Sequence, residues 1–228
     1  MRDGFLGLAR NSRPLCYALF MGMSVEEPIR IAGVCGSLRH GSYTKMALTI
    51  ALKAAAGASS CETDLIDLRE FNLPFADGSR DGANASADVR RLRERIKNAD
   101  GVIIGTPEYH GSFAGVLKNA LDLTGFTEWE GKMIGLIGVG GGRMGAYQAL
   151  HSLRDIGRSL HAWVIPEQVS IPEAYKYFDA AGNLNDHLIE KRLLEVGRQV
   201  ARFAYLHKCA TAHEFLADWE KSHPNPGA

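Results

Sequence analysis

The sequence predicts an α/β protein in which helices cover both faces of a central parallel sheet. Short apolar runs alternate along the chain with amphipathic segments, as expected where strands and covering helices take turns. Three of these runs carry almost no polar residues, which indicates strands buried on both faces. The 228 residues, 46% of them hydrophobic, suffice for one well-buried domain, whereas a second full domain would be cramped.

Five strands and five main helices are expected in alternation. The apolar runs predict strands at residues 30–35, 62–67, 101–106, 133–139 and 162–165. The helical periodicity predicts helices at residues 43–56, 87–98, 113–123, 145–160 and 186–206, with a short terminal helix around 212–220. Residues 71–84 are rich in turn residues and lack periodicity, so they are expected to form a long loop that either borders a binding site or is disordered.

The folded domain is expected to span residues 28–208. Residues 1–27 combine three arginines with an apolar run over 14–23, which loosely imitates a targeting segment, but no cleavage-site pattern follows. We interpret them as an N-terminal extension without fixed structure, or as the product of a misplaced start. Residues 209–228 are expected to form a C-terminal helix and a frayed tail.

Composition narrows the class of partner to small molecules. Lys plus Arg and Asp plus Glu both number 26, and this balance argues against a dedicated binder of nucleic acid or anionic membranes. No apolar run approaches the roughly 20 residues that span a bilayer. The four cysteines are scattered without zinc-ligand spacing, so we expect no metal site and reduced thiols in a cytoplasmic protein.

The loop after the first strand, residues 36–42, has the composition of a phosphate-binding loop. It joins a buried strand to a helix N-terminus, where unpaired N–H groups and the helix dipole favour an anion. Ser37 and Ser42 add hydroxyl donors, and the planar guanidinium of Arg39 matches phosphate oxygens. The alternative is an ordinary strand-to-helix turn in which Ser42 is the helix N-cap.

Two further loops carry unusual residues at strand ends. Residues 106–112 follow the third strand, and the glycine-rich residues 138–145 follow the fourth. Ligands of open parallel sheets bind at the carboxyl ends of the strands, and these loops can surround one ligand only if strands 1, 3 and 4 are neighbours. The strand order 2-1-3-4-5 meets that condition, which predicts a flavodoxin-like three-layer sandwich.

The same loops carry a family resemblance. Residues 36–42, residues 106–112 and their continuation at 115–122 make the segment 29–171 resemble the NAD(P)H-dependent FMN reductases. This flavodoxin-like group includes quinone, chromate and azo-dye reductases. The resemblance implies bound FMN, and an assembly of two or four identical chains. The cofactor-binding residues that it implies are Ser37, Arg39, Ser42, Tyr43 and Thr44 for the phosphate, Pro107, Glu108, Tyr109, His110 and Gly111 along the isoalloxazine ring, and Gly140, Gly141, Gly142 and Arg143 on its other side.

The activity implied by the resemblance is that of an FMN-dependent NAD(P)H oxidoreductase. The flavin N5 would take a hydride from NADPH or NADH and pass electrons to a quinone, free flavin or a similar small acceptor, with ping-pong kinetics. Because the flavin carries the redox chemistry, no catalytic side chain is expected. The alternative is a flavodoxin-like electron carrier or a non-catalytic flavin-binding regulator. Carriers are commonly acidic, whereas this chain is neutral.

The sequence leaves a second interpretation open for several of these residues. Glu108 and Tyr109 could be plain exposed loop residues, Lys118 fits a solvated helix face, and Arg143 could cap or solvate its helix. His110 stands where the family most often has Asn. Imidazole can ionise near neutral pH, and a positive charge close to the flavin would stabilise its reduced anionic form.

The third loop also matches the dinucleotide fingerprint G-x-G-x-x-G over residues 140–145, with Glu167 near the end of the next strand. Taken alone, this match suggests a Rossmann dehydrogenase. In such domains the motif follows the first strand, whereas here it follows the fourth. We therefore interpret the match as coincidental.

Overall fold

A computed structural model describes residues 28–57, 61–78, 86–179 and 181–209, together with 213, 214, 217, 218 and 221. The predicted extension at residues 1–27 and most of the predicted terminal segment lie outside the described residues. Among the helices of the described part, none is long and apolar enough to cross a membrane.

The central sheet has the predicted strand order. Its strands are β1 (Ile29–Cys35), β2 (Cys61–Asp67), β3 (Gly101–Tyr109), β4 (Ser112–Phe113), β5 (Met133–Val139) and β6 (Trp163–Ile171). Five of them form a parallel sheet in the order β2-β1-β3-β5-β6, while β4 pairs antiparallel with the end of β3. The expected flavodoxin-like order is confirmed, with β4 as an addition.

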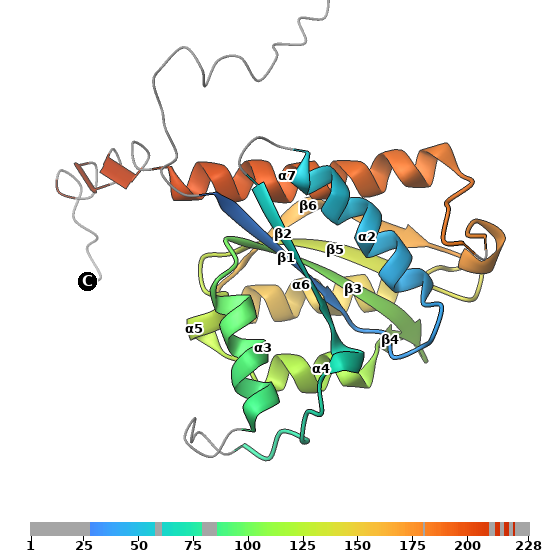
Figure 1. Ribbon diagram of the computed structural model, residues 1–228, viewed down its shortest axis with the longest axis horizontal. Helices are drawn as coiled ribbons and strands as arrows, with labels where there is room; N and C mark the ends of the chain where they lie inside the picture. The colour runs from blue at the N-terminus through green and yellow to red at the C-terminus, as the bar shows by residue number, and fades with distance from the viewer. Residues whose placement is uncertain are drawn as a thin grey trace, which may run out of the picture.

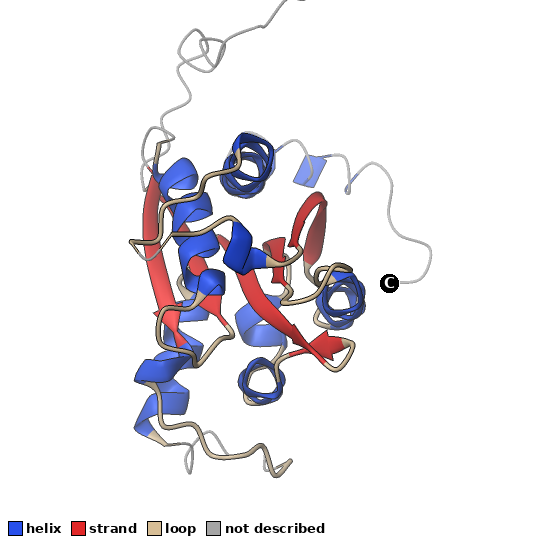
Figure 2. Cartoon of the chain, turned by 90° about the vertical axis from the view of Figure 1, so that its right-hand side faces the viewer, coloured by secondary structure: helices blue, strands red, loops and turns tan. Residues whose placement is uncertain are grey.

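Helices cover both faces of this sheet (Figures 1 and 2). They are α2 (Tyr43–Ala56), α3 (Ala87–Lys97), α4 (Gly115–Asp122), α5 (Phe126–Trp129), α6 (Tyr147–Ser159) and α7 (His187–Lys208), with short 3-10 turns at Leu68–Glu70 and Ala174–Lys176. One core cluster packs α2 and α7 on one face of the sheet, and a second packs α3, α4 and α6 on the other. The three-layer sandwich follows from this division.

The burial of each strand explains its composition. Every residue of β5 is buried, as are the first seven residues of β3, because these strands lie inside the sheet between two helix layers. The edge strand β2 instead exposes Glu62, Thr63 and Asp64.

The helices α7 and α2 cross very closely on their side of the sheet. A Cβ on Gly197 of α7 would lie 2.0 Å from the carbonyl oxygen of Ala51 in α2.

Two predicted boundaries are wrong around β4. The third strand was expected to end at residue 106, but it continues to Tyr109 because Glu108 and Tyr109 pair with Phe113 and Ser112 across a tight hairpin. Its two loop residues, His110 and Gly111, have φ of 51° and 77°. Positive φ at both positions is typical of a type I′ turn. The helix expected from residue 113 therefore begins only at Gly115.

The last strand is also longer than the sequence predicts. It extends past residue 165 to Ile171, with an irregularity in its pairing: Ile134 of β5 faces Val164, while Leu136 faces Gln168. Pro166 and two polar residues lie in this irregular stretch, which a strand at the sheet edge tolerates. The helix expected from residue 145 begins at Tyr147.

Candidate functional site

The three predicted loops meet at one edge of the sheet. The carboxyl ends of β1, β3 and β5 are neighbours, with Cys35 paired to Gly105 and Pro107 paired to Val139. Backbone hydrogen bonds fasten the loops to adjacent strands: the Gly36 N–H donates to the Gly105 carbonyl at 2.8 Å, and the Gly140 N–H donates to Ile171 at 2.8 Å. A single ligand can therefore contact all three loops.

The first loop, residues 36–42, combines buried hydroxyls with an exposed cation. Ser37 and Ser42 are 3% and 6% exposed, whereas Arg39 lies at the surface. The Ser42 Oγ accepts a hydrogen bond from the Lys45 N–H at 3.3 Å and so caps α2, while the Ser37 Oγ accepts from the Arg39 N–H at 3.4 Å. Because each hydroxyl keeps its own proton to donate, the N-cap interpretation is correct and does not exclude the phosphate interpretation.

The first turn of α2 supplies further donors to this loop. Tyr43 and Thr44 are its first two residues, and N–H groups at these helix positions have no intrahelical acceptor. Thr44 is buried, and the Tyr43 ring stacks on Phe178 with the ring centroids 5.6 Å apart. The loop and the first turn of α2 thus carry two buried hydroxyls, two amides without intrahelical acceptors and one exposed guanidinium, and this set suits a phosphate dianion.

A cluster of charges beside this loop was missed by the sequence interpretation. Asp67, at the end of β2, is 1% exposed and bonds to two cations. Its Oδ2 accepts from Lys45 Nζ at 2.8 Å and from Arg69 Nη2 at 2.6 Å. Burial alone would raise the pKa of Asp67, but the hydrogen bonds from Arg69 and Lys45 lower it to about 2. The sequence signal for this cluster was Asp67 at the end of a predicted strand, two residues before the basic Arg69.

The second loop is the hairpin between β3 and β4. Pro107 is buried, Tyr109 is 47% exposed, and His110 and Gly111 form the exposed turn. The Thr106 hydroxyl donates to the Pro107 carbonyl at 2.9 Å and accepts from the Ala114 N–H at 3.1 Å. These bonds hold the backbone at the base of the hairpin in one position.

Glu108 has a structural partner within this site. Its Oε2 accepts from the Ala149 N–H at 3.0 Å, in the first turn of α6, a helix that has no N-cap side chain of its own. Glu108 is therefore not a plain exposed loop residue. Its carboxylate joins the hairpin to α6, so its backbone is the part of Glu108 that is available to contact a ligand.

The third loop offers bare backbone to the same edge. A Cβ on Gly140 would lie 2.2 Å from the Gly145 carbonyl oxygen, so this glycine closes the loop, whereas a Cβ on Gly141 or Gly142 would meet nothing within 4 Å. Open space at two successive glycines fits the approach of a flat ring. Arg143 is exposed. The start of α6 is held by Ser170, whose Oγ accepts from the Ala146 N–H at 2.8 Å, and not by the Arg143 side chain.

Two residues of the continuation at 115–122 also have defined partners. Lys118 Nζ lies 2.7 Å from Asp122 Oδ1 on the exposed side of α4, as the solvated-face interpretation expects. The Asn119 side chain bonds to the Pro74 carbonyl and the Ala76 N–H, both at 2.9 Å, and so fastens the start of the loop predicted at 71–84. Residues 79–84 of that loop lie outside the described residues.

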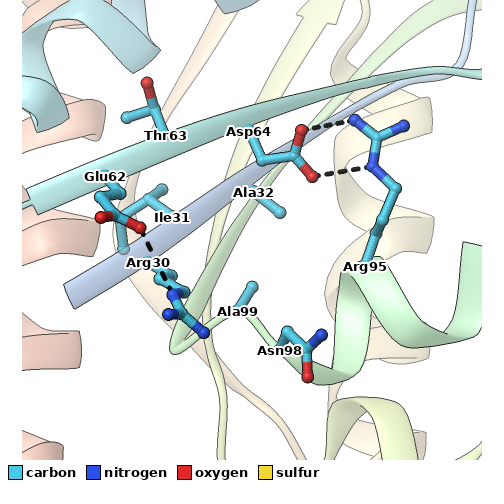
Figure 3. Close-up of a pocket in the computed structure, with 9 residues that line it drawn as sticks. All are labelled: Arg30, Ile31, Ala32, Glu62, Thr63, Asp64, Arg95, Asn98 and Ala99. Carbon is cyan, nitrogen blue, oxygen red and sulfur yellow. Dashed lines mark hydrogen bonds and ion pairs between the residues drawn. The ribbon is translucent and has the colours of Figure 1, made fainter. Parts of the chain in front are cut away.

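A hollow of ≈ 250 Å³ lies away from this edge, between β1, β2 and α3 (Figure 3). Its charged side chains pair with one another: Arg95 Nε donates to Asp64 at 2.8 Å, and Arg30 Nε lies 3.4 Å from Glu62. Because these charges already neutralise each other, the hollow has no excess charge for a ligand.

A parallel sheet of this order, with a donor-rich first loop and a glycine-rich third loop at its carboxyl edge, defines a flavodoxin-like binding protein. The family model described as NADPH-dependent FMN reductase matches residues 29–176. The chain belongs to this family. The dinucleotide fingerprint at 140–145 is accordingly coincidental, and Glu167 lies 3.3 Å from Arg192 in an ion pair.

Relatives over most of the chain agree with this assignment. The chain is 34% identical over 178 residues to an NAD(P)H-dependent FMN reductase of Pseudomonas aeruginosa, covering 74% of this chain and 94% of the relative. It is 34% identical to a probable NADPH:quinone oxidoreductase of Oryza sativa subsp. japonica, covering 74% and 88%. An FMN-dependent NADPH-azoreductase of Staphylococcus aureus is also 34% identical, covering 75% and 92%.

Solved structures show the same fold. The flavoenzyme NAD(P)H:(acceptor) oxidoreductase FerB of Paracoccus denitrificans superposes with a TM-score of 0.61 at 28% identity, covering 78% of this chain and 98% of that one. The apo form of an NADH:FMN oxidoreductase gives 0.64 at 21% identity, covering 77% and 89%. The expected function is confirmed at the level of the family: an NAD(P)H-dependent oxidoreductase with FMN as cofactor.

Proposed function

We propose that this chain binds FMN across the three loops, with the phosphate on the first loop and the ring between the second and third. The observation that carries this placement is that the buried Ser42 hydroxyl caps α2 while the buried Ser37 lies in the same loop directly before that helix. A phosphate group carries about −1.5 to −2 charges at neutral pH and needs a cation besides neutral donors. Arg39 is the exposed cation of this loop.

The remaining family positions would orient the ring. The backbone of residues 107–111, stiffened by Pro107 and the Thr106 bonds, would pair with the polar edge of the isoalloxazine. Gly140, Gly141, Gly142 and Arg143 would close the other side, where the absence of Cβ atoms at Gly141 and Gly142 leaves room. The flavin-binding unit in this proposal is the domain over residues 28–208.

Bound FMN supplies the redox chemistry, accepting a hydride from NADPH or NADH and delivering electrons to a second small molecule. The protein contributes binding, orientation and electrostatics. Because donor and acceptor would use one exposed face, they would bind in turn, which gives ping-pong kinetics. Quinones, free flavins and azo compounds are the acceptor classes that we propose, since relatives are named as reductases of these compounds.

We also propose that the enzyme is cytoplasmic and forms a homodimer or homotetramer. The free thiols of Cys35, Cys61 and Cys209 support an intracellular setting. The exposed side chains of Met144 in the third loop and of Tyr147 at the start of α6, 86% and 60% accessible, support burial against another copy.

Removal of the Arg39 guanidinium tests the placement of the phosphate. Arg39→Ala should weaken FMN binding about 10- to 100-fold, because a hydrogen bond to a charged group contributes about 1.5–3 kcal/mol. Flavin fluorescence quenching on titration of the apoprotein measures the affinity. Arg158→Ala, an equal change in the exposed last turn of α6, is the control and should bind FMN as the wild type does. Full FMN affinity in Arg39→Ala would contradict the placement.

A further inference from the structure

We propose that Lys45 and Arg69, held in place by Asp67, form a second layer of positive charge that makes the site select phosphorylated flavin over riboflavin. Under this proposal Asp67 is a positioning residue, and the two cations act on the phosphate through their field. The inference rests on the proposed binding of the FMN phosphate at residues 36–42.

The cluster borders that loop on two sides. Asp67 pairs in register with Cys35, the residue that directly precedes the loop. The Cys35 Sγ lies 4.0 Å from the Ser37 carbonyl oxygen. On the other side, Lys45 lies in the first turn of α2, with its backbone N–H bonded to the Ser42 hydroxyl. The same lysine thus contacts the loop with its backbone and Asp67 with its side chain.

The geometry of Asp67 fixes both cations before any ligand arrives. Its Oδ1 accepts from the Arg69 N–H and from Arg69 Nε, both at 3.1 Å, and its Oδ2 accepts from Arg69 Nη2 and from Lys45 Nζ. Two cations against one carboxylate leave one net positive charge. Cations held in advance cost no further ordering when an anion binds, in contrast to a free surface side chain.

Incomplete burial leaves this charge able to act beyond the cluster. The side chains of Lys45 and Arg69 remain 35% and 27% exposed, while Asp67 is 1% exposed. The carboxylate is therefore the shielded member, whereas both cations remain partly accessible to solvent. A dianionic phosphate gains from such a field, whereas the uncharged ribityl end of riboflavin does not. Selectivity between the two flavins is the expected consequence.

Flavin affinities of charge-neutralised variants test the proposal. Apoproteins of the wild type, Lys45→Gln and Arg69→Gln are titrated with FMN and with riboflavin at low salt, and flavin fluorescence reports binding. Each variant should lose about tenfold in FMN affinity with no change for riboflavin. Its FMN affinity should also fall less steeply with added salt, because fewer charges act on the phosphate. Lys53→Gln, in the last turn of the same helix, is the matched control and should behave as the wild type.

An equal loss for FMN and riboflavin, or unchanged FMN affinity and salt dependence in both variants, would overturn the proposal. The salt dependence decides the outcome even if riboflavin binds too weakly to measure. A wild-type protein that binds both flavins equally would instead contradict the proposed phosphate site itself. Wild-type preference for FMN that Arg39→Ala abolishes and the two cluster variants retain would contradict only the role of the cluster.

Discussion

At the scale of single residues, the buried carboxylate of Asp67 is expected to make stability depend on pH. Its pKa is lowered from 3.8 to about 2 in the folded protein, so its contribution is present above the unfolded value and lost as pH falls from about 4 to about 2. The shift corresponds to about 2 kcal/mol of unfolding free energy at neutral pH.

Urea unfolding of the wild type and Asp67→Asn across pH measures this contribution. The unfolding free energies of the two proteins should differ by a constant amount from pH 5 to 8, and this difference should shrink as pH falls below about 4. Asp122→Asn, which affects the exposed pair with Lys118, should change stability by less than about 1 kcal/mol. If the difference in unfolding free energy between wild type and Asp67→Asn stays constant down to pH 2, the ionisation of Asp67 does not contribute to stability.

The turn between β3 and β4 constrains His110, a residue that the family resemblance places along the flavin ring. Its φ of 51° is a conformation that Asn adopts more readily than His, and Asn-Gly is the preferred pair for this turn type. The Asn common in the family thus has a backbone reason at this position. Whether the imidazole also acts on the flavin is a separate hypothesis.

The variant His110→Asn tests that hypothesis. If a positive charge on the imidazole stabilises reduced flavin, the substitution should lower the flavin reduction potential at acidic pH. Spectroelectrochemical titration of the FMN-loaded protein at acidic pH measures this shift. Equal potentials in wild type and variant at acidic pH would limit His110 to its role in the turn.

At the scale of elements, one side chain joins the hairpin to the first turn of α6. Glu108 accepts the hydrogen bond of the Ala149 N–H, a group that no N-cap side chain of α6 pairs with, so Glu108→Ala should destabilise the protein by about 1–2 kcal/mol. Glu108→Gln keeps an oxygen acceptor and should retain most of that stability. Thermal unfolding measures both variants. Equal stability of Glu108→Ala and wild type would show that the bond to Ala149 contributes nothing.

Most elements could be predicted from the sequence because their patterns are local. The prediction at residues 43–56 matches α2, and the prediction at 133–139 matches β5, since Ser42 signals the helix start and an unbroken apolar run signals the strand. The hairpin end of β3 was missed because His replaces the Asn of the usual Asn-Gly signal. The hydrogen bond from the Ala149 N–H to Glu108 joins residues 41 positions apart and leaves no local pattern.

At the scale of the whole molecule, the strand order brings together loops that are distant in the sequence. The three loops can share one edge only if β1, β3 and β5 are neighbours, and they are. The cluster around Asp67 could not be predicted in the same way, because it depends on the pairing of β2 with β1 and on the direction of the Lys45 side chain. Loop composition and strand order therefore predicted that the three loops meet at one edge, and only packing revealed the charges beside the first of them.

Anaerobic titration of the FMN-reconstituted protein with NADPH or NADH, followed by absorbance, tests whether this protein is an FMN-dependent oxidoreductase. The protein is expected to take up FMN and show the absorption bands of bound oxidised flavin. About one equivalent of nicotinamide should then bleach them without any second protein, as a two-electron hydride transfer requires. Failure to take up FMN would contradict the proposed flavin site, and a bound flavin that neither nicotinamide reduces would indicate an electron carrier or a regulator.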